Sequence, residues 1–190
     1  ADAMLLLRTV AETMAVVHSQ GIGHRDLKPR NLFLPNGDLS RVKVLDFGIA
    51  RRTVTVHSMT GTGRLIGTPA YMAPEQVAGK KVITAAADIF SLGCIFYECL
   101  AGEPPFDGEQ IYALLVCILF EEAQSITAKR PDVPPAVNEL IQHMLAKEPA
   151  RRLASAHQLL TELSKLRLST VEPLPNLAEL KRKNPGFAEK

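Results

Sequence analysis

Apolar side chains recur every three or four positions at the start of the chain and predict an amphipathic helix from about residue 3 to residue 19. Gly21 follows this pattern, and glycine is common just after the C-terminus of a helix. The pattern begins without an N-cap residue, and the first residue is Ala1 rather than methionine. We therefore expect the sequence to be a fragment that starts inside a helix. The apolar positions are Ala3, Leu6, Leu7, Val10, Met14 and Val17.

Two short apolar runs on either side of a strong turn signal predict a β-hairpin. Residues 32–34 would form the first strand and residues 42–45 the returning strand. The turn between them, Pro35-Asn36-Gly37-Asp38, contains the Asn-Gly pair that favours a tight turn. Residues 49–75 are rich in Thr, Gly and Arg and lack an apolar period, which predicts a long irregular loop that is either functional or disordered.

The pattern from residue 85 onward is helical. Residues 89–100 are apolar nearly all round, which predicts a helix buried on every side. Further helices are predicted at about 109–121, 135–146 and 155–167, with proline-containing loops between them. The apolar run 111–120 is much shorter than the ~20 residues that cross a membrane, so we interpret it as a core helix. The tail from residue 171 has prolines and mixed charge, which predicts loose order.

The composition is that of one globular domain, with 46% hydrophobic and 22% charged side chains among 190 residues. The net charge of +2 indicates neither a nucleic-acid-binding nor a membrane-binding surface. Cys94, Cys99 and Cys117 form no CxxC pair. Cys94 and Cys99 lie five residues apart in an apolar stretch, so we interpret them as small buried hydrophobic residues. An odd number of cysteines and the absence of an N-x-[ST] sequon favour a reducing compartment.

The register of the predicted hairpin leads to a prediction about chemistry. If the two strands pair across the turn, the open end of the hairpin brings Asn31 close to Asp46, because paired residues lie roughly 5 Å apart. An amide oxygen and a carboxylate at that separation suit Mg²⁺. Asp26 and Lys28 precede Asn31 in the same loop. A carboxylate, a compact cation and two metal ligands in one place favour phosphoryl transfer.

Each of these residues taken singly has a structural alternative: Asp26 as a loop carboxylate, Lys28 as a solvated charge and Asn31 as a turn former. Together they belong to three ordered motifs, which are HRDLKPRN at residues 24–31, DFG at residues 46–48 and APE at residues 73–75. The set resembles the catalytic loop, the metal-binding motif and the end of the activation segment of protein kinases. Three motifs in this order are far more specific than one.

The resemblance implies a fold and a domain organisation. Residues 1–168 would form the C-terminal lobe of the protein kinase fold, mainly α-helical with a short β-hairpin, and residues 169–190 a C-terminal extension or linker. The N-terminal lobe would be absent, because the sequence contains no Gly-rich loop, no V-A-I-K lysine and no partner glutamate. Lys43 cannot take that part, since it lies in the strand leading to Asp46. We therefore expect very slow phosphate transfer by the isolated chain and an active kinase as the parent protein.

The resemblance also implies roles for residues of the site. Asp26 would orient the substrate hydroxyl and accept its proton, and Lys28 would steady the transferring phosphate. Asn31 and Asp46 would bind Mg²⁺. With Phe33 packed under the adenine, Lys28, Asn31 and Asp46 would also form the ATP site, although Phe33 could equally be an ordinary member of the hairpin core.

Further residues would have structural roles by the same resemblance. Asp88 resembles the aspartate of the family's central helix that holds the catalytic-loop backbone, and an ordinary acidic residue at a helix N-terminus is the compatible alternative. Arg152 lies in a segment like the family's Asp-Pro-x-x-Arg and would pair with Glu75 across 77 residues of chain. His24 and Phe47 would be structural members of their motifs.

The type of kinase follows from the same comparison. Lys28 and the segment GTPAY at residues 67–71, with Thr68 as the substrate-loop threonine, resemble the Ser/Thr-specific pattern. Arg25 would pair with a phosphorylated activation loop. Thr60 and Thr62 resemble the paired threonines of bacterial Ser/Thr kinases and are the predicted phosphosites, with a merely flexible Thr/Gly loop as the alternative.

The expected cofactors are ATP and one or two Mg²⁺ ions, for which Mn²⁺ could substitute. The expected partners are proteins with Ser or Thr acceptors, the missing N-terminal lobe and a second kinase copy in a dimer, but not nucleic acid. The expected location is cytoplasmic, with the parent protein anchored in a membrane through a segment outside this sequence as an alternative. Two other functions stay open: a non-catalytic kinase-like binding module or pseudokinase scaffold, and a small-molecule phosphotransferase such as an antibiotic kinase.

Overall fold

A computed structural model of the chain describes residues 2–47 and 69–166. The predictions made for residues 49–68 and for the tail from residue 171 lie outside this part. In chain order, with η for a 3-10 helix, the elements are α1 Asp2–Ser19, η1 Pro29–Asn31, β1 Leu32–Phe33, η2 Pro35–Gly37, η3 Leu39–Arg41, β2 Lys43–Val44, η5 Pro69–Tyr71, α2 Pro74–Val77, α3 Ala86–Ala101, α4 Ile111–Phe120, α5 Ile126–Lys129, α6 Pro135–Met144, η6 Pro149–Arg151 and α7 Ala156–Lys165.

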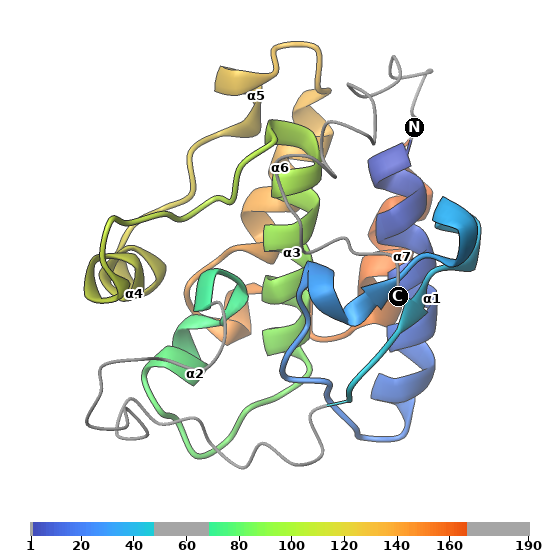
Figure 1. Cartoon of the computed structure of the whole chain (residues 1–190), viewed down its shortest axis with the longest axis horizontal. Coiled ribbons are helices and arrows are strands. Elements are labelled where there is room, and N and C mark those ends of the chain that lie inside the picture. Colours follow the sequence, from blue (N-terminus) through green and yellow to red (C-terminus); the bar gives the residue numbers. More distant parts are fainter. Residues whose placement is uncertain (1, 48–68, 167–190) are drawn as a thin grey trace.

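Helix α3 is the centre of the fold, with α1 and α7 on one side and α4 on the other (Figure 1). Every residue from Ala86 to Leu100 is buried, which confirms the prediction of a helix covered on all sides. Packing against α6 is close at Gly93, where an added Cβ would lie 2.9 Å from the Cβ of Met144. Glycine is required there because a larger side chain would force the two helices apart.

Helix α1 links the rest of the helical core to the hairpin. It packs along α7 and also contacts α3, η3 and β2. Its buried face consists of the predicted apolar positions up to Met14, together with Ala11. The helix ends at Ser19, and Gly21 follows with a φ of 72°, as the sequence pattern predicts. The chain therefore leaves α1 next to the hairpin, where the predicted catalytic loop begins.

The predicted hairpin is present, with shorter strands than expected. β1 and β2 pair antiparallel, with Leu32 opposite Val44 and Phe33 opposite Lys43. Asn36 and Gly37 both have positive φ, the conformation for which an Asn-Gly pair is suited. The connection also contains η2 and η3, which shorten each strand to two residues. The register still places the residues after β2 beside those before β1.

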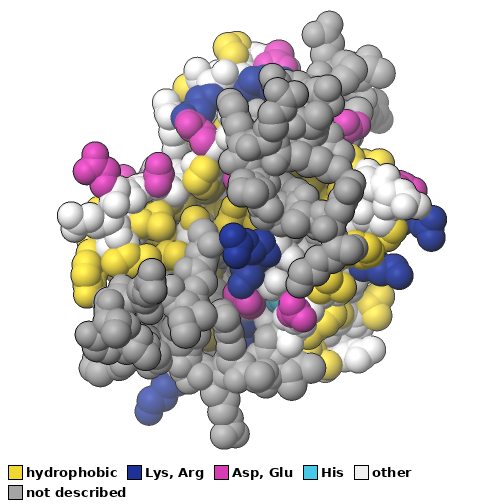
Figure 2. Space-filling view, in the orientation of Figure 1, with side chains coloured by type: hydrophobic (Ala, Val, Ile, Leu, Met, Phe, Trp, Pro, Cys, Tyr) yellow, Lys and Arg dark blue, Asp and Glu magenta, His cyan; other side chains and the backbone are white. Residues whose placement is uncertain are grey.

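Helix α4 corrects the prediction of a core helix at residues 111–120. Leu114, Leu115 and Ile118 are buried, but Tyr112, Val116 and Phe120 are 57%, 51% and 75% exposed. Apolar side chains gather at the left of the molecule, where α4 lies (Figure 2). A run that is apolar on all faces does not by itself reveal which faces are covered, and here only one side of the helix meets the core.

Lys147 contacts both the C-terminal end of α4 and the core. Its Nζ donates to the carbonyl oxygens of Ile118 at 2.8 Å and Cys117 at 3.2 Å, and lies 3.8 Å from the ring centroid of Phe106. A cation over an aromatic face and at a helix C-terminus is favourably placed. Burial nevertheless lowers the pKa of Lys147 to about 8.

The lowered pKa of Lys147 predicts a pH-dependent stability. The folded-state pKa of about 8 lies below the ordinary value of 10.5, so between these pH values the unfolded chain binds more protons than the folded chain. The contribution of Lys147 to the free energy of unfolding therefore rises with pH across this window. Urea denaturation at pH 8 and pH 10 should show a smaller rise in Lys147→Met than in the wild type. An identical rise in both proteins would contradict this, and Lys80→Met controls for the loss of an exposed lysine.

Several short elements were not predicted, among them η5, α2 and α5. η5 and the start of α2 fall within residues 69–75, which were expected to be an irregular loop, and α5 lies between two predicted helices. Each spans only three or four residues, too few to show a period of 3.6. Pro69 and Pro74 begin two of these helices, where the missing N–H and fixed φ of proline are tolerated.

The cysteines of α3 are buried, as predicted. Burial raises the pKa of the Cys94 thiol and raises that of Cys99 to about 12, so both act as protonated apolar side chains. Cys117 on α4 is half-buried. In residues 2–47 and 69–166 no helix is long and apolar enough to cross a bilayer.

Candidate active site

The loop between α1 and β1 is held by the carboxylate of Asp88 at the start of α3. The backbone N–H of His24 donates to its Oδ2 at 2.8 Å, and that of Arg25 donates to its Oδ1 at 2.6 Å. Asp88 is 1% exposed, and charge-assisted bonds of this kind are strong in a buried setting. Arg25 has a φ of 65°. The structure thus shows the contact expected of Asp88, and it fixes the backbone directly before Asp26.

Asp26, Lys28 and Asn31 lie together in this loop. The Nζ of Lys28 is 2.8 Å from Oδ2 of Asp26, with side chains 15% and 22% exposed. The amide nitrogen of Asn31 donates to the backbone oxygen of Asp26 at 2.8 Å and to its Oδ2 at 3.4 Å. The carboxylate of Asp26 is therefore oriented from two sides while part of it still reaches solvent.

The hairpin register brings the residues around Asp46 beside Asn31, as the sequence predicts. The N–H of Leu45 donates to the backbone oxygen of Asn31 at 2.8 Å. His24 connects the two segments. Its Nε2 lies 2.8 Å from the backbone oxygen of Leu45, and its Nδ1 lies 3.2 Å from the backbone nitrogen of Asp26. A backbone N–H can only donate, so Nδ1 is the acceptor and Nε2 carries the proton.

Two phenylalanines follow the two segments that meet here: Phe33 lies two residues after Asn31, and Phe47 directly follows Asp46. The ring of Phe47 is 4.9 Å from the ring of His24 and tilted by 46°, an ordinary aromatic contact. Phe47 thus packs against His24, the other motif residue for which a structural role is expected. Phe33 is half-buried on β1 opposite Lys43, and its place under an adenine stays a prediction.

The donor atoms suit a divalent cation that is shared with a phosphate. Asn31 uses its amide nitrogen on Asp26, which leaves the amide oxygen as the atom able to bind a cation. Asp46 supplies a carboxylate from the adjacent segment. Among the described residues no group of three or more His, Cys, Asp or Glu side chains could hold a metal by itself. Two oxygen donors fit Mg²⁺, which usually keeps phosphate and water in its shell.

Arg25 contacts the backbone near α3 and a side chain of α2 in the described part. Its guanidinium donates to the backbone oxygen of Ile83 at 3.3 Å, and its own backbone oxygen accepts from Nε2 of Gln76 at 2.8 Å. The predicted phosphosites Thr60 and Thr62, and the predicted substrate-loop residue Thr68, lie outside the described residues. The phosphate-pairing role of Arg25 therefore stays a prediction.

Glu75 and Arg152 form the buried ion pair expected from the sequence. The two guanidinium nitrogens of Arg152 lie 2.8 Å from the two carboxylate oxygens of Glu75, and the side chains are 0% and 6% exposed. Arg152 also donates to the backbone oxygens of Lys147 at 2.7 Å and Ala86 at 3.1 Å. It packs over Phe90, with Cζ 4.9 Å from the ring centroid. The pair thus connects α2, α3 and η6.

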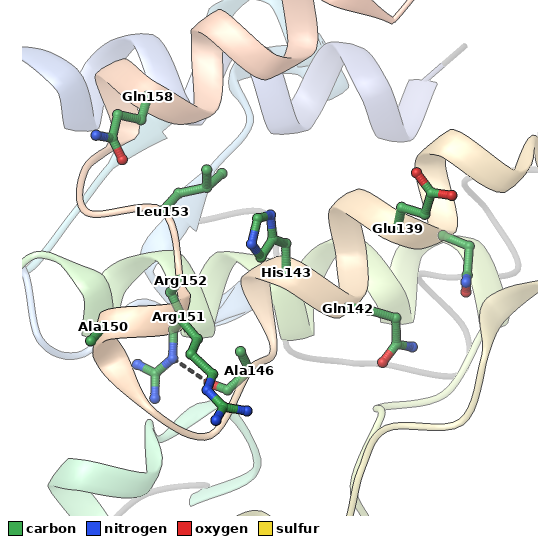
Figure 3. A pocket seen from close by; sticks show the side chains of 10 residues that line it. Glu139, Gln142, His143, Ala146, Ala150, Arg151, Arg152, Leu153 and Gln158 are labelled. Carbon is green, nitrogen blue, oxygen red and sulfur yellow. Dashed lines mark hydrogen bonds between the residues drawn. The ribbon is translucent and has the colours of Figure 1, made fainter.

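A shallow hollow of about 740 Å³ lies between α6, η6 and the start of α7. Figure 3 shows Arg152 in its wall, donating to the backbone oxygen of Ala146, with Arg151 beside it. His143 and Gln142 line it from α6. None of the predicted catalytic or metal-binding residues lines this hollow, so it is separate from the candidate active site.

Two supporting residues escaped the sequence analysis. Gln76 links α2 to the catalytic loop through Arg25, and it also accepts from the N–H of Ala73 at 3.1 Å. Its position three residues after Ala73, at the start of a helix, is a local signal that could have indicated a capping role. His18 binds Asp88 at 3.0 Å. A lone histidine in the last turn of α1 gives no sequence signal for a partner 70 residues away.

Comparison with known proteins agrees with this geometry. The model of the protein kinase domain family matches residues 1–163. The serine/threonine-protein kinase PknD of Mycobacterium tuberculosis is 38% identical over 160 residues, which cover 84% of this chain and 24% of PknD. Pkn1 of Myxococcus xanthus is 41% identical over 152 residues, covering 79% of this chain and 22% of Pkn1. The chain therefore spans about a quarter of the length of these curated relatives.

A solved structure is similar over most of the described fold. The crystal structure of Rad53 1-466 in complex with AMP-PNP has a TM-score of 0.66 and 28% sequence identity, and the match covers 85% of this chain and 39% of that chain. The predicted fold class, mainly α-helical with a short hairpin and corresponding to a kinase C-terminal lobe, agrees with this match.

Proposed function

The chain belongs to the protein kinase domain family, and from this membership we propose that it is the catalytic C-terminal lobe of a serine/threonine protein kinase. The reaction would transfer the γ-phosphoryl group of ATP to Ser or Thr hydroxyls of proteins. Its similarity to bacterial proteins named serine/threonine-protein kinases supports this acceptor class. The observation that supports the proposal is the junction at which Asp88 fixes the backbone before Asp26. There His24 and the hairpin register hold Leu45, the residue before Asp46, beside Asn31.

The residues of this junction would divide the chemistry among them. The carboxylate of Asp26 orients the substrate hydroxyl and accepts its proton as the oxygen attacks phosphorus. Lys28, 2.8 Å from Asp26, places a positive charge where negative charge develops. Asn31 and Asp46 would hold the divalent cation, and bound ATP with its cation supplies the phosphoryl group and neutralises its charge. In this proposal the lobe contributes to phosphoryl transfer through positioning and electrostatics.

The acceptor class is tested with a gene product that contains this chain. We expect phosphate from γ-labelled ATP to appear on Ser and Thr of a generic basic protein and not on Tyr. Transfer to an aminoglycoside in preference to the protein would favour the small-molecule phosphotransferase. Absence of any transfer, with partner binding retained, would favour the binding module or pseudokinase scaffold.

Asp46→Asn tests the cation site. Removing a charged ligand worth about 1.4 kcal/mol or more should raise the Mg²⁺ concentration for half-maximal rate by about 10-fold or more. The rate is measured as a function of Mg²⁺ and of Mn²⁺, and the number of ions is read from the shape of the curve. Asp38→Asn removes an exposed carboxylate of the same hairpin and is the control. Equal Mg²⁺ dependence in Asp46→Asn and the wild type would exclude Asp46 as a metal ligand.

We also propose that the 190-residue chain alone transfers phosphate very slowly. Its sequence holds no Gly-rich loop and no V-A-I-K lysine, and those parts cover and clamp the phosphates in this family. Residues outside this sequence would supply them. Transfer by the purified chain, lost in Asp26→Asn, would overturn this proposal while supporting the assignment of the site.

A further inference from the structure

His18 is buried at the point where three separate segments meet. It lies in the last turn of α1, with a side chain that is 3% exposed. Its Nε2 is 3.0 Å from Oδ2 of Asp88 at the start of α3, and its Nδ1 is 3.1 Å from the backbone N–H of Ala156 at the first residue of α7. A buried side chain with both ring nitrogens engaged has little freedom to reorient.

The bond to Ala156 determines which nitrogen of His18 is protonated. A backbone N–H can only donate, so Nδ1 must offer its lone pair. In the neutral imidazole the proton is then on Nε2, which donates to Asp88. The N–H of Ala156 thus sets the tautomer that Asp88 requires. A proton on Nδ1 would place two donors against each other.

The carboxylate of Asp88 receives donors on both oxygens. Oδ1 accepts from Arg25 at 2.6 Å, and Oδ2 accepts from His24 at 2.8 Å and from His18 at 3.0 Å. The two backbone donors belong to the catalytic loop, whereas His18 belongs to the helical core. His18 is therefore the donor that can fix the rotation of the carboxylate independently of the loop that the carboxylate holds.

We propose that His18 is a positioning residue for the reaction: its Nε2–H fixes the Asp88 carboxylate, which in turn places the backbone before Asp26. This inference rests on the proposed function, because it assigns His18 to the same site. His18 contacts neither Asp26 nor Asn31 in the described structure. The N-terminus of α7 holds His18, and His18 holds Asp88, which contacts the catalytic loop. His18 would therefore influence the reaction through Asp88.

Two amide substitutions separate this role from a merely structural one. The amide of glutamine lies near the position of Nε2, and that of asparagine near the position of Nδ1. His18→Gln keeps a donor for Asp88 and loses the acceptor for Ala156. His18→Asn keeps the acceptor for Ala156 and loses the donor for Asp88. Both remove one buried hydrogen bond, so both should lower Tm by a similar amount.

The catalytic effects of the two variants should differ. In a gene product that transfers phosphate, we expect His18→Asn to lower kcat by about 10-fold to 100-fold, the cost of a small misplacement of a catalytic group. His18→Gln should retain kcat within about threefold, and both should keep KM for ATP near the wild-type value. Equal kcat values in the two variants would overturn the proposal, because a structural role would affect them alike.

A second measurement on the 190-residue chain is independent of activity. Long-range ¹H–¹⁵N NMR of the wild type should show the proton of His18 on Nε2, and the amide proton of Arg25 should resonate far downfield because of its 2.6 Å bond. The Arg25 signal should move upfield in His18→Asn and stay in place in His18→Gln. A proton on Nδ1 of the wild type would overturn the proposal even if neither variant folds. Correct NMR signals in a gene product without transferase activity would instead count against the proposed function alone.

Discussion

Replacing Arg152 by alanine is expected to lower the free energy of unfolding by about 3–5 kcal/mol, because it leaves the Glu75 carboxylate buried without its partner. Glu75 is 6% exposed at its side chain and accepts both guanidinium nitrogens at 2.8 Å. The backbone oxygens of Lys147 and Ala86 would lose a donor as well. The change is measured by urea denaturation followed by circular dichroism, and by Tm.

Arg151→Ala provides the matched control for Arg152→Ala. Arg151 is the neighbouring arginine, and it pairs with Glu148 at 3.1 Å while both side chains are largely exposed. Loss of an exposed ion pair should change the free energy of unfolding by less than about 1 kcal/mol. An unchanged Tm in Arg152→Ala, or equal losses in the two variants, would show that the buried pair does not stabilise the lobe.

Replacing Asp26 by asparagine is expected to lower kcat by about 10²-fold to 10⁴-fold, the usual contribution of a positioned general base. Asparagine has nearly the same shape, and its side-chain oxygen can still accept from Lys28, which lies 2.8 Å from the carboxylate. The fold should therefore persist while the proton acceptor is lost. The value of kcat is measured with γ-labelled ATP at saturating substrate, in a gene product that contains this chain and transfers phosphate.

Asp107→Asn is the control for Asp26→Asn, because Asp107 is an exposed aspartate that accepts from the N–H of Gly108. It should leave kcat near the wild-type value. A fully active Asp26→Asn would remove Asp26 from the proton-transfer role. A loss of kcat together with a large fall in Tm would show that Asp26 acts mainly in holding the loop.

The sequence predicted the parts of the fold that short-range patterns determine. Helical spacing located α1, α3, α6 and α7, and an Asn-Gly turn located the hairpin whose register brings Asn31 beside the residues around Asp46. The pairing of Glu75 with Arg152 followed from motifs that resemble those of a known family. These features depend on local propensity or on a resemblance to the family, so a single amino-acid sequence was enough to predict them.

The sequence did not predict features that depend on how distant elements pack. The run 111–120 is apolar on all faces, so nothing in it shows that Phe120 lies in solvent while Ile118 lies in the core. His18 meets Asp88 and Ala156 across 70 and 138 residues of chain. No period in the sequence encodes such a contact, because its geometry arises only when α1, α3 and α7 pack together.

The positive φ values at the candidate site also affect how this lobe can evolve. Besides Asn36 in the turn, Arg25 at 65° and Asp46 at 53° are the non-glycine residues with positive φ in the described part. Each left-handed L-residue costs roughly 1–2 kcal/mol, which glycine avoids. Glycine at either position would relieve this strain but would remove the guanidinium of Arg25 or the carboxylate of Asp46, so this lobe carries its site side chains at a cost in backbone energy.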